Sequence, residues 1–326
     1  MTAPQITRGT ARGTHRITAQ DVTVLMPVWR GDRPDRFRAA LRSATGDQTA
    51  PPAELLVVVD GPVGSDLADV LHAVEDGEFG PARVLRAPEH RGLAPTLQEG
   101  LEAVRTAYVA RADADDLCRP ERLELQIRAV RAQPVDLLGG AMQEFSEAVP
   151  RGTGPLRVRP LHHQQIVRYL RGHSPFHHPT VMMRADAARD AGGYRDLPLL
   201  EDYWLWERMI LAGARCANLP DVLVDYRVDA DLFARRGGLR LLRSDLRLQR
   251  ILHRDGVISA PRMLLNLGHR AAYRLAPWWL RRWGYRVLVE GRAPARADGA
   301  PGAAEAGQGS GGAPRRVQTG RTGPLG

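Results

Sequence analysis

The sequence predicts an α/β protein in which a mostly parallel β-sheet carries helices on both faces. Three observations predict it: short Val- and Leu-rich runs, segments of helical spacing between them, and turn residues that end the runs. A strand buried on both faces is apolar along its length, and parallel neighbours are joined by crossovers that are usually helical. Of the 326 residues 43% are hydrophobic, so the chain can supply a substantial core.

The first half of the chain alternates regularly between strands and helices. The runs predicted as strands are 22–28, 53–62, 82–88 and 107–113, and the helices predicted between them are 33–46, 65–76 and 93–105. Ligands bind such sheets at the carboxyl ends of the strands. Asp60 and Asp113 both lie at such an end, so the sequence predicts a binding site at this edge of the sheet.

The second half of the chain is less regular. A helix that opens with Pro120 is predicted over 120–133, a strand over 136–146, and further helices over 161–172 and 200–213. Composition and pattern together divide the chain into four parts. These are a flexible N-terminus (1–20), the α/β domain (21–230), a basic helical extension (231–290) and a disordered Gly/Ala/Pro-rich tail (291–326).

Positive charge is concentrated in the C-terminal third. Every basic residue is Arg, and residues 227–326 hold 19 of them against 7 acidic residues, whereas residues 1–226 are nearly neutral. Such a region suits a phosphate-bearing surface, either lipid or nucleic acid. Within 262–289, Arg270, Arg274 and Arg281 would share one helix face beside several Trp residues. This pattern favours a helix in an anionic membrane interface, and the alternative is a helix that packs on the α/β domain.

Several protein classes are excluded by what the sequence lacks. Its two cysteines, Cys118 and Cys216, can form neither a disulfide framework nor a CxxC zinc site, which fits a reducing compartment. The first 20 residues have no apolar signal core, and no run reaches about 18 apolar residues. We therefore expect a cytoplasmic protein, with peripheral attachment to the inner face of the plasma membrane through its basic end.

The stretch "YVARADADDLCRPERL" (108–123) places three carboxylates directly after an apolar run. In an extended chain Asp113 and Asp115 point the same way. Hard oxygen ligands select Mg²⁺ or Mn²⁺, and an ion held by one or two carboxylates completes its shell with water and substrate phosphates. The alternative is a solvated acidic loop that caps the helix 120–133.

Seven motifs in this order resemble the family 2 glycosyltransferases, which have the GT-A fold: "VLMPVWRG", "VVVDGP", "EHRGLAPTLQEGL", "ARADADDLCRPERLELQ", "SPFHHPTVMMR", "GGYRDLPLLEDYWLWERMILAG" and "LPDVLVDYRV". The resemblance covers about residues 21–230. Residues 235–259 also look similar to bacterial polysaccharide-assembly enzymes of the amylovoran-biosynthesis type. The resemblance implies transfer of a sugar from a nucleotide diphosphate donor, most commonly of uridine, to an acceptor hydroxyl. A saccharide, or a lipid-linked saccharide, is the implied acceptor.

The resemblance also assigns donor-binding residues. Pro27, Val28 and Trp29 would flank the nucleotide base, Asp60 would contact it, and Arg91-Gly92 would lie near the nucleotide. This chain departs from the family pattern in three places. Trp29 replaces the usual Tyr, Asp60 stands alone where two acids are frequent, and Arg91 replaces a frequent Asn.

For catalysis the resemblance implies a metal site and a base. Asp115 would bridge Mn²⁺ or Mg²⁺ to the donor diphosphate, with Asp113 on the metal, the donor sugar or the ribose, and Asp116 behind them. Asp202 would be the general base that deprotonates the acceptor hydroxyl, with Glu201 beside it. Attack opposite the leaving group would invert the anomeric centre. The alternative is that both acids only favour the N-terminus of the helix 200–213.

On the acceptor side the resemblance places His178, while Trp204 and Trp206 are candidates because they adjoin the predicted base. The alternative for both tryptophans is a packed helix face. A metal cluster of His173, His177 and His178 is disfavoured, because Pro179 indicates a turn that enters a strand.

Two other functions compete with the transferase. A sugar-phosphate nucleotidyltransferase would need a Gly-rich N-terminal loop, which "MPVWRGDRP" does not supply. A nucleic-acid-binding protein is supported only by the Arg excess, with no recognition motif. We therefore expect no nucleic-acid partner.

Overall fold

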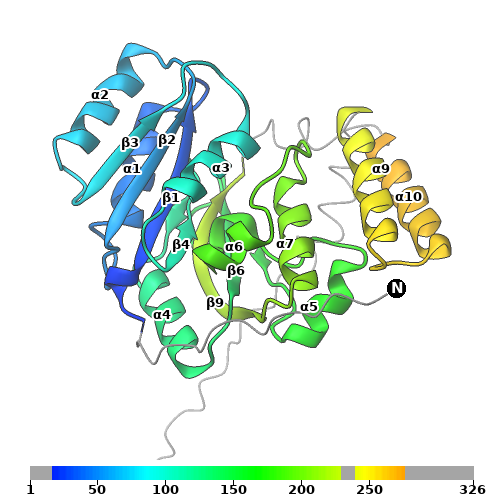
Figure 1. Cartoon of the computed structure of the whole chain (residues 1–326). Coiled ribbons are helices and arrows are strands. Elements are labelled where there is room, and N and C mark those ends of the chain that lie inside the picture. The colour runs from blue at the N-terminus through cyan, green and yellow to red at the C-terminus, as the bar shows by residue number, and fades with distance from the viewer. Residues whose placement is uncertain (1–16, 229–238, 276–326) are drawn as a thin grey trace, which may run out of the picture. The chain divides into compact units, whose positions relative to one another are not determined.

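The computed structural model of the chain describes residues 17–228 and 239–275. Its nine strands form one mixed sheet in the order β3-β2-β1-β4-β8-β6-β9-β5, with β7 paired to β6 (Figure 1). The chain is thus an α/β protein with helices around one sheet, as the sequence predicts.

The first half of the sheet is parallel and confirms the predicted alternation. Its strands are β1 (Val22–Trp29), β2 (Glu54–Asp60), β3 (Ala82–Arg86) and β4 (Tyr108–Arg111), and its helices are α1 (Pro34–Ala44), α2 (Ser65–Glu75) and α3 (Leu93–Ala103). All seven predicted elements are present, and only their ends differ by a few residues.

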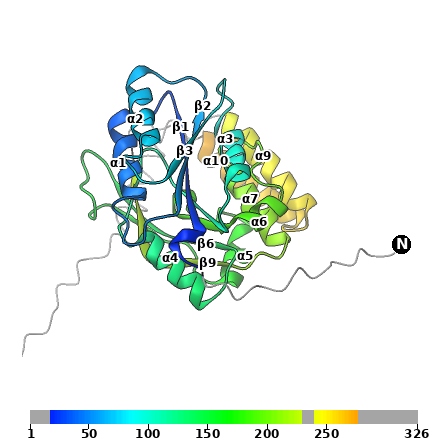
Figure 2. The same ribbon diagram turned by 60° about the vertical axis from the view of Figure 1, so that its left-hand side comes forward.

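Helices cover both faces of the sheet, and each face has its own core (Figure 2). Along β1, Val24 and Met26 pack toward α1, α2 and α4 (Arg122–Ala132), whereas Leu25 packs toward α3, α6 (Ala185–Asp190) and α7 (Glu201–Leu211). Alternate side chains of a strand point to opposite faces. The uninterrupted apolar runs follow from this double burial.

Pro27 lies in a central strand without breaking the ladder. Proline cannot donate a backbone hydrogen bond and is normally confined to edges. The Leu25 carbonyl accepts from the Ala112 N–H at 3.0 Å, so the backbone polar groups of Leu25 point toward β4. Those of Pro27, two residues further along the strand, point to the same side. Because β4 pairs with β1 only from Val22 to Leu25, no strand lies opposite Pro27 on that side.

The second half of the sheet mixes directions. Its strands are β5 (Leu117–Cys118), β6 (Leu137–Phe145), β7 (Leu156–Arg157), β8 (Met182–Arg184) and β9 (Cys216–Arg227), and its remaining helices are α5 (His163–Leu170) and the short η2 (His178–Thr180). Strand β8 runs antiparallel to both β4 and β6. The predicted strand 136–146 and helices 120–133, 161–172 and 200–213 are confirmed. Strands of two or three residues have no detectable period, so the sequence analysis missed them.

Two further helices, α9 (Leu239–Arg254) and α10 (Ala260–Leu275), pack against each other and against the segment after α5. Asn266 donates to Gln249 and to the carbonyl of Arg171, both at 2.8 Å. Arg270 pairs with the buried Asp245 and donates to the Gly172 carbonyl at 2.8 Å. Arg270 therefore faces inward, and the predicted lipid-facing role for it was wrong.

The described chain begins at Ile17, inside the predicted flexible N-terminus 1–20. Ile17 is buried, its carbonyl accepts from Arg131 at 2.6 Å, and Ala19 accepts from Ala53. These contacts connect residues 17–19 to the α/β domain. Residues 1–16, the predicted tail 291–326 and the tryptophans of 276–289 lie outside the described residues. None of the helices in the described ranges is long and apolar enough to cross a membrane.

Candidate active site

Three strand ends meet at one edge of the sheet. Trp29, the last residue of β1, pairs in register with Asp60, the last residue of β2. Arg111 ends β4 on the other side of β1, and the chain continues from it into the acidic loop 112–116. This is the edge at which the sequence predicted a ligand site.

Asp60 holds the turn that precedes α3. Its carboxylate accepts the backbone N–H groups of Arg91 at 2.7 Å and of Gly92 at 2.9 Å, and lies 2.9 Å from His90 Nδ1. A carboxylate has about four acceptor positions, so Asp60 retains capacity for a further donor. The Arg91 side chain pairs with Glu99 at the surface.

Trp29 presents an aromatic face beside this turn. Trp29 is 41% exposed, and its ring stacks on His90 with centroids 5.5 Å apart. The rings are already in contact, so a base would stack on the outer face of Trp29. Gly31 permits this placement, because a Cβ there would lie 2.2 Å from the indole. Pro27 and Val28 are buried and can reach a ligand only through their backbone.

The acidic loop is fixed at several points. Asp113 pairs with Arg111. Asp116 accepts the Arg227 backbone N–H at 2.8 Å, and the Arg227 Nε donates to the Asp115 carbonyl at 2.9 Å. These contacts connect the loop to the end of β9.

Two carboxyl groups at this edge, those of Asp116 and Asp32, have raised pKa values. Burial, and then the charges of Asp113 and Asp115, raises the pKa of Asp116 well above its ordinary value. Burial also raises the pKa of Asp32 to about 7, with Asp115 and Asp113 adding to it. The Asp32 carboxylate accepts the Trp29 N–H at 2.9 Å, which ties the β1–α1 loop to the same edge.

These carboxyls fit a divalent cation. Asp116 Oδ2 is buried and makes no hydrogen bond within the described part of the chain. Burial is the main cause of the raised pKa values of Asp116 and Asp32, and a cation would offset the repulsion from Asp113 and Asp115 that adds to it. Across residues 17–228 and 239–275, no three His, Cys, Asp or Glu side chains form a complete metal site. An ion here would need further ligands from water or substrate phosphates.

Arg111 is the central residue that the sequence analysis overlooked. Its guanidinium is buried; burial works to lower its pKa, but Asp113, Tyr194 and Asp116 outweigh burial and the pKa is raised. Its charge also acts to lower the pKa values of Glu201 and Asp202. The available signal was an arginine inside the apolar run 107–113.

Glu201 and Asp202 form the first turn of α7. Leu199, two residues before Glu201, has a positive φ of 67°. This left-handed conformation costs a non-glycine residue about 1–2 kcal/mol. Asp202 accepts the Tyr203 N–H at 2.6 Å. Burial raises the pKa of Asp202 to about 6. Burial, with the charge of Asp202, raises the pKa of Glu201, so the pair readily holds one proton near neutral pH.

His178 and Tyr194 join the same neighbourhood. His178 Nε2 lies 3.0 Å from the Tyr194 hydroxyl. Burial, and then Arg111, lowers the pKa of His178 well below its ordinary value, so the imidazole is neutral. Burial raises the pKa of the Tyr194 hydroxyl, and the charges of Arg111, Asp202 and Glu201 also act on this pKa. His178 is thus oriented by Tyr194, which the sequence analysis missed.

Trp204 and Trp206 were wrongly predicted as an acceptor platform. Trp206 is 0% exposed and Trp204 is 8% exposed, and both belong to the core between the sheet and its helices. The guanidinium groups of Arg195, Arg208 and Arg247 lie over the Trp204 ring. Neither ring offers a face to a sugar, so the packing alternative holds.

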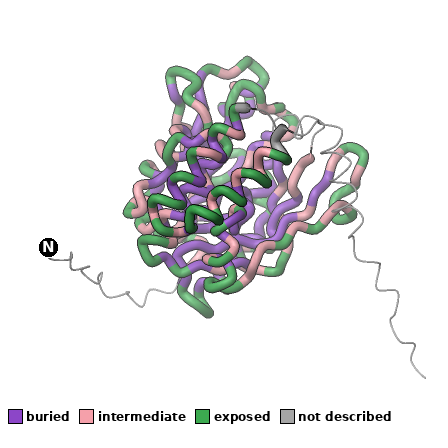
Figure 3. Tube along the Cα trace, turned by 90° about the vertical axis from the view of Figure 1, so that its right-hand side faces the viewer, coloured by how far each residue is buried: buried purple, intermediate pink, exposed green. Residues whose placement is uncertain are grey.

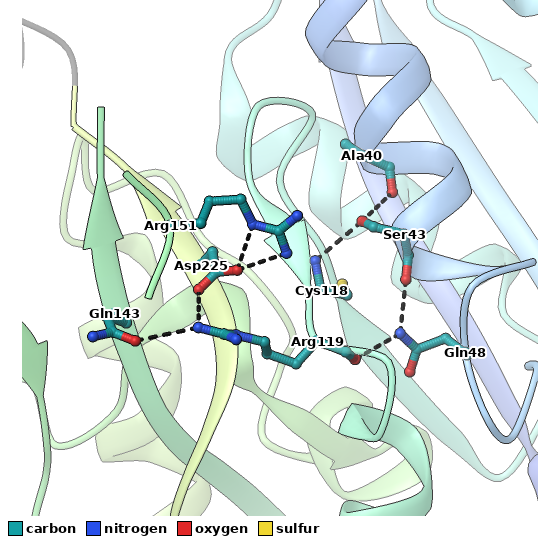
Figure 4. A network of polar contacts seen from close by, with 8 residues as sticks. All are labelled: Ala40, Ser43, Gln48, Cys118, Arg119, Gln143, Arg151 and Asp225. Atoms are coloured by element: carbon teal, nitrogen blue, oxygen red, sulfur yellow. Dashed lines mark hydrogen bonds and ion pairs between the residues drawn. The ribbon is translucent and has the colours of Figure 1, made fainter. Parts of the chain in front are cut away.

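A polar network supports the acidic loop from behind (Figure 4). Strand β5 directly follows the loop, and the Cys118 N–H donates to Ser43 Oγ at 3.0 Å. The buried Asp225 of β9 lies 2.6 Å from Arg119 and 2.7 Å from Arg151. The network thus fixes β5 between α1 and β9.

Asp225→Ala is expected to lower the free energy of unfolding by about 2 kcal/mol, because it removes the carboxylate that accepts charge-assisted hydrogen bonds from two partly exposed arginines. Thermal unfolding should show a fall in Tm of roughly 4–8 °C. Asp221→Ala on the same strand removes an exposed carboxylate and is the matched control. Equal Tm values for the two variants would contradict this account of the network.

Comparison with known proteins decides the family. The sequence profile described as "Glycosyl transferase family 2" matches residues 23–192, more than half of the chain. The chain belongs to glycosyl transferase family 2. The site described above lies in this matched region, apart from Tyr194, the acids of α7 and the residues of β9.

Two relatives of this glycosyltransferase are close along most of their length. The amylovoran biosynthesis glycosyltransferase AmsE of Erwinia amylovora is 35% identical over 230 residues, which are 70% of this chain and 84% of AmsE. The UDP-Gal:alpha-D-GlcNAc-diphosphoundecaprenol beta-1,3-galactosyltransferase of Escherichia coli is 30% identical over 268 residues, 82% of this chain and 96% of that enzyme. These relatives support bacterial polysaccharide biosynthesis as the setting.

A solved structure supports the fold. The mannosyltransferase PcManGT from Pyrobaculum calidifontis, in complex with GDP-Man and Mn²⁺, superposes with a TM-score of 0.56 at 20% identity. The match covers 88% of this glycosyltransferase and 77% of that chain. Membership of the family favours the transferase over the nucleotidyltransferase and the nucleic-acid-binding protein considered above.

The glycosyltransferase has a hollow of about 480 Å³ beside α1 and β5. Asp47, Pro120 and Arg151 complete its lining, which includes none of the predicted donor or catalytic residues. The open edge at Trp29, Asp113 and Asp202, rather than this hollow, is therefore the candidate active site.

Proposed function

We propose that this glycosyltransferase inverts the anomeric centre, depends on a divalent metal, and moves a sugar from a UDP-sugar to a lipid-linked saccharide. The observation that carries the proposal is the position of Arg111. Its buried charge pairs with Asp113 of the acidic loop and also acts on Glu201 and Asp202. A loop suited to donor phosphates and a pair suited to general-base catalysis therefore share one site.

The donor base would stack on the exposed face of Trp29, with Asp60 accepting a base N–H. Asp60 already holds the turn of Arg91 and Gly92 in place, so the same carboxylate would shape and read the base site. Stacking on an aromatic ring contributes about 1–3 kcal/mol per base. The backbone of Pro27 and Val28 would border this position.

Asp115, with Asp113, would hold Mn²⁺ or Mg²⁺ at the donor diphosphate. The ion, when bound, neutralises charge on the leaving diphosphate. Asp116 would remain behind these residues, held by the Arg227 N–H. The relation to PcManGT supports a metal in this fold but gives no ligand for this chain.

Asp202 would remove the proton from the acceptor hydroxyl as its oxygen attacks the anomeric carbon from the side opposite the diphosphate. Burial raises the pKa of Asp202 to about 6, close to the operating pH, where a general base works best. Glu201 would store the proton that the pair shares. Arg111 would limit the rise in the pKa of Asp202 and keep it ionised.

The acceptor would approach from the side of His178 and Tyr194. The galactosyltransferase relative is named for a diphosphoundecaprenol-linked acceptor, and its similarity over 96% of its length supports a lipid-linked acceptor here. Such an acceptor lies in a membrane, so we place the enzyme in the cytoplasm at the inner membrane face.

The pH profile should reveal the base. Asp202 must be ionised to accept a proton, so kcat should fall as the pH decreases through about 6. Arg111→Met removes a charge that lowers the pKa of Asp202, so the acid limb should move to higher pH. Rate profiles of both proteins between pH 5 and 9 check this, with Tm recorded in parallel. An unmoved limb in a folded variant would contradict the role of Arg111.

Transfer itself tests the proposed function. The purified enzyme, Mn²⁺ and a panel of UDP-sugars would be incubated with a diphosphate-lipid-linked N-acetylglucosamine, and the product linkage read by NMR. We expect one donor to give a product of inverted anomeric configuration. A product of retained configuration would overturn the mechanism, and transfer only from GDP- or dTDP-sugars would overturn the donor.

A further inference from the structure

Helix α9 carries arginines along one side. Their spacing of three, four and three residues places them on one helix face, and all four are exposed: Arg240, Arg243, Arg247 and Arg250. We call them the arginine row. The opposite side of α9 is buried through Leu241, Leu248 and Leu252, so the row has a fixed outward direction.

No carboxylate within the described ranges forms an ion pair with the arginine row. The only acid in α9 is Asp245, which is buried and paired with Arg270. Arg254 at the helix end pairs with Asp255 and is for that reason outside the row. A solvated helix face normally mixes charges of both signs, and like charges three and four residues apart repel. The row is therefore suited to an external anionic surface.

The positive surface continues toward the active site. Arg247 Nη1 lies 3.5 Å from the Asp196 carbonyl. The guanidinium groups of Arg247 and Arg195 lie 6.0 and 5.7 Å from the centre of the Trp204 ring. Arg195 is exposed and belongs to the segment that leads into Glu201-Asp202. A molecule or membrane that binds the arginine row therefore lies beside the segment that leads into Glu201-Asp202.

Helix α10, which packs against α9, exposes apolar side chains as well. Leu264 and Leu265 are each 65% exposed. The contacts of Asn266 with Gln249 and of Arg270 with Asp245 set an antiparallel register, which places the leucines level with Arg250. The side of the protein that faces the viewer in Figure 3 carries exposed turns of this helix pair. A helix pair that exposes both arginines and leucines suits lipid, whereas a nucleic acid would leave the leucines in water.

We propose that the arginine row, with Arg195, Leu264 and Leu265, is a docking surface for an anionic lipid bilayer. The arginines contact headgroups and the leucines enter the headgroup boundary. Docking holds the segment 195–202 next to the bilayer. The docking itself does not depend on the proposed function. The further consequence, that docking brings the active site to a lipid-linked acceptor, rests on the proposed function.

Vesicle flotation of the full chain tests the docking without donor or acceptor. Two kinds of vesicle are compared. One is phosphatidylcholine alone, and the other is phosphatidylcholine with about 30% phosphatidylglycerol. Binding to the anionic vesicles should weaken with salt. One arginine at such a surface strengthens binding about fivefold. Replacement of the whole row by Gln should therefore weaken binding at least about 50-fold.

The matched control changes four exposed arginines elsewhere to Gln: Arg42, Arg105, Arg128 and Arg215. It should bind nearly as the wild type does. A triple variant that spares Arg247 keeps its contact with Asp196 and should still lose most of the binding. No binding of the wild type to anionic vesicles, or equal losses in row and control variants, would overturn the proposal. Binding of duplex DNA through the row, as tight as vesicle binding, would replace the bilayer with a nucleic acid.

Discussion

Asp202→Asn is expected to lower kcat by a factor of about 10²–10⁴ and to leave the affinity for UDP unchanged. The amide keeps the shape of the side chain, and its oxygen can still accept the Tyr203 N–H. It cannot take the proton of the acceptor hydroxyl. Initial rates with saturating donor, together with calorimetric titration of UDP, measure the two effects separately.

Glu201→Gln is the matched control for this prediction. Glu201 is the neighbour in sequence and is buried, whereas Asp202 is half-buried; in this account Glu201 only shares a proton with the base. We expect a smaller loss in kcat and a shifted acid limb. An Asp202→Asn enzyme with more than a tenth of the wild-type kcat would assign the base to another residue.

Asp115→Asn is expected to remove the metal dependence of UDP binding and to lower kcat at least about 100-fold. A metal at the leaving diphosphate contributes several kcal/mol to the transition state, and each 1.36 kcal/mol is a factor of ten. Calorimetric titrations of UDP with Mn²⁺ and with EDTA check the binding.

Asp69→Asn, an exposed carboxylate on α2, is the control for Asp115→Asn. It should behave as the wild type does in both conditions. If Asp115→Asn still bound UDP more tightly with Mn²⁺ than with EDTA, the ion would have other ligands and our assignment of Asp115 would be wrong.

The fold was predictable where burial leaves a strong pattern. Strands β1 and β2 are buried on both faces, so their runs are apolar throughout and easily recognised. Strands β5 and β8 have two and three residues. Their existence depends on pairing with β9 and β4, which are distant in sequence, and no local period records such pairing.

The site was predictable only in part for a similar reason. The acids at strand ends, such as Asp60 and Asp113, follow from the rule that ligands bind there. Arg111 is important because it interacts with groups far away in sequence, such as Tyr194 and Asp202. In the sequence alone, Arg111 is only one charged residue inside an apolar run. The two tryptophans show the opposite error, because proximity to Asp202 in sequence suggested a surface role for side chains that the fold buries.

Calorimetric titration of UDP into the wild-type enzyme, first with Mn²⁺ and then with EDTA, tests the central claim most directly. The claim is that the edge formed by Trp29, Asp60 and Asp115 binds a nucleotide diphosphate through a divalent ion. We predict saturable binding with Mn²⁺ that EDTA weakens by at least about tenfold, as expected for an ion bound to the diphosphate. Equal affinity in the two conditions, or no binding in either, would contradict it.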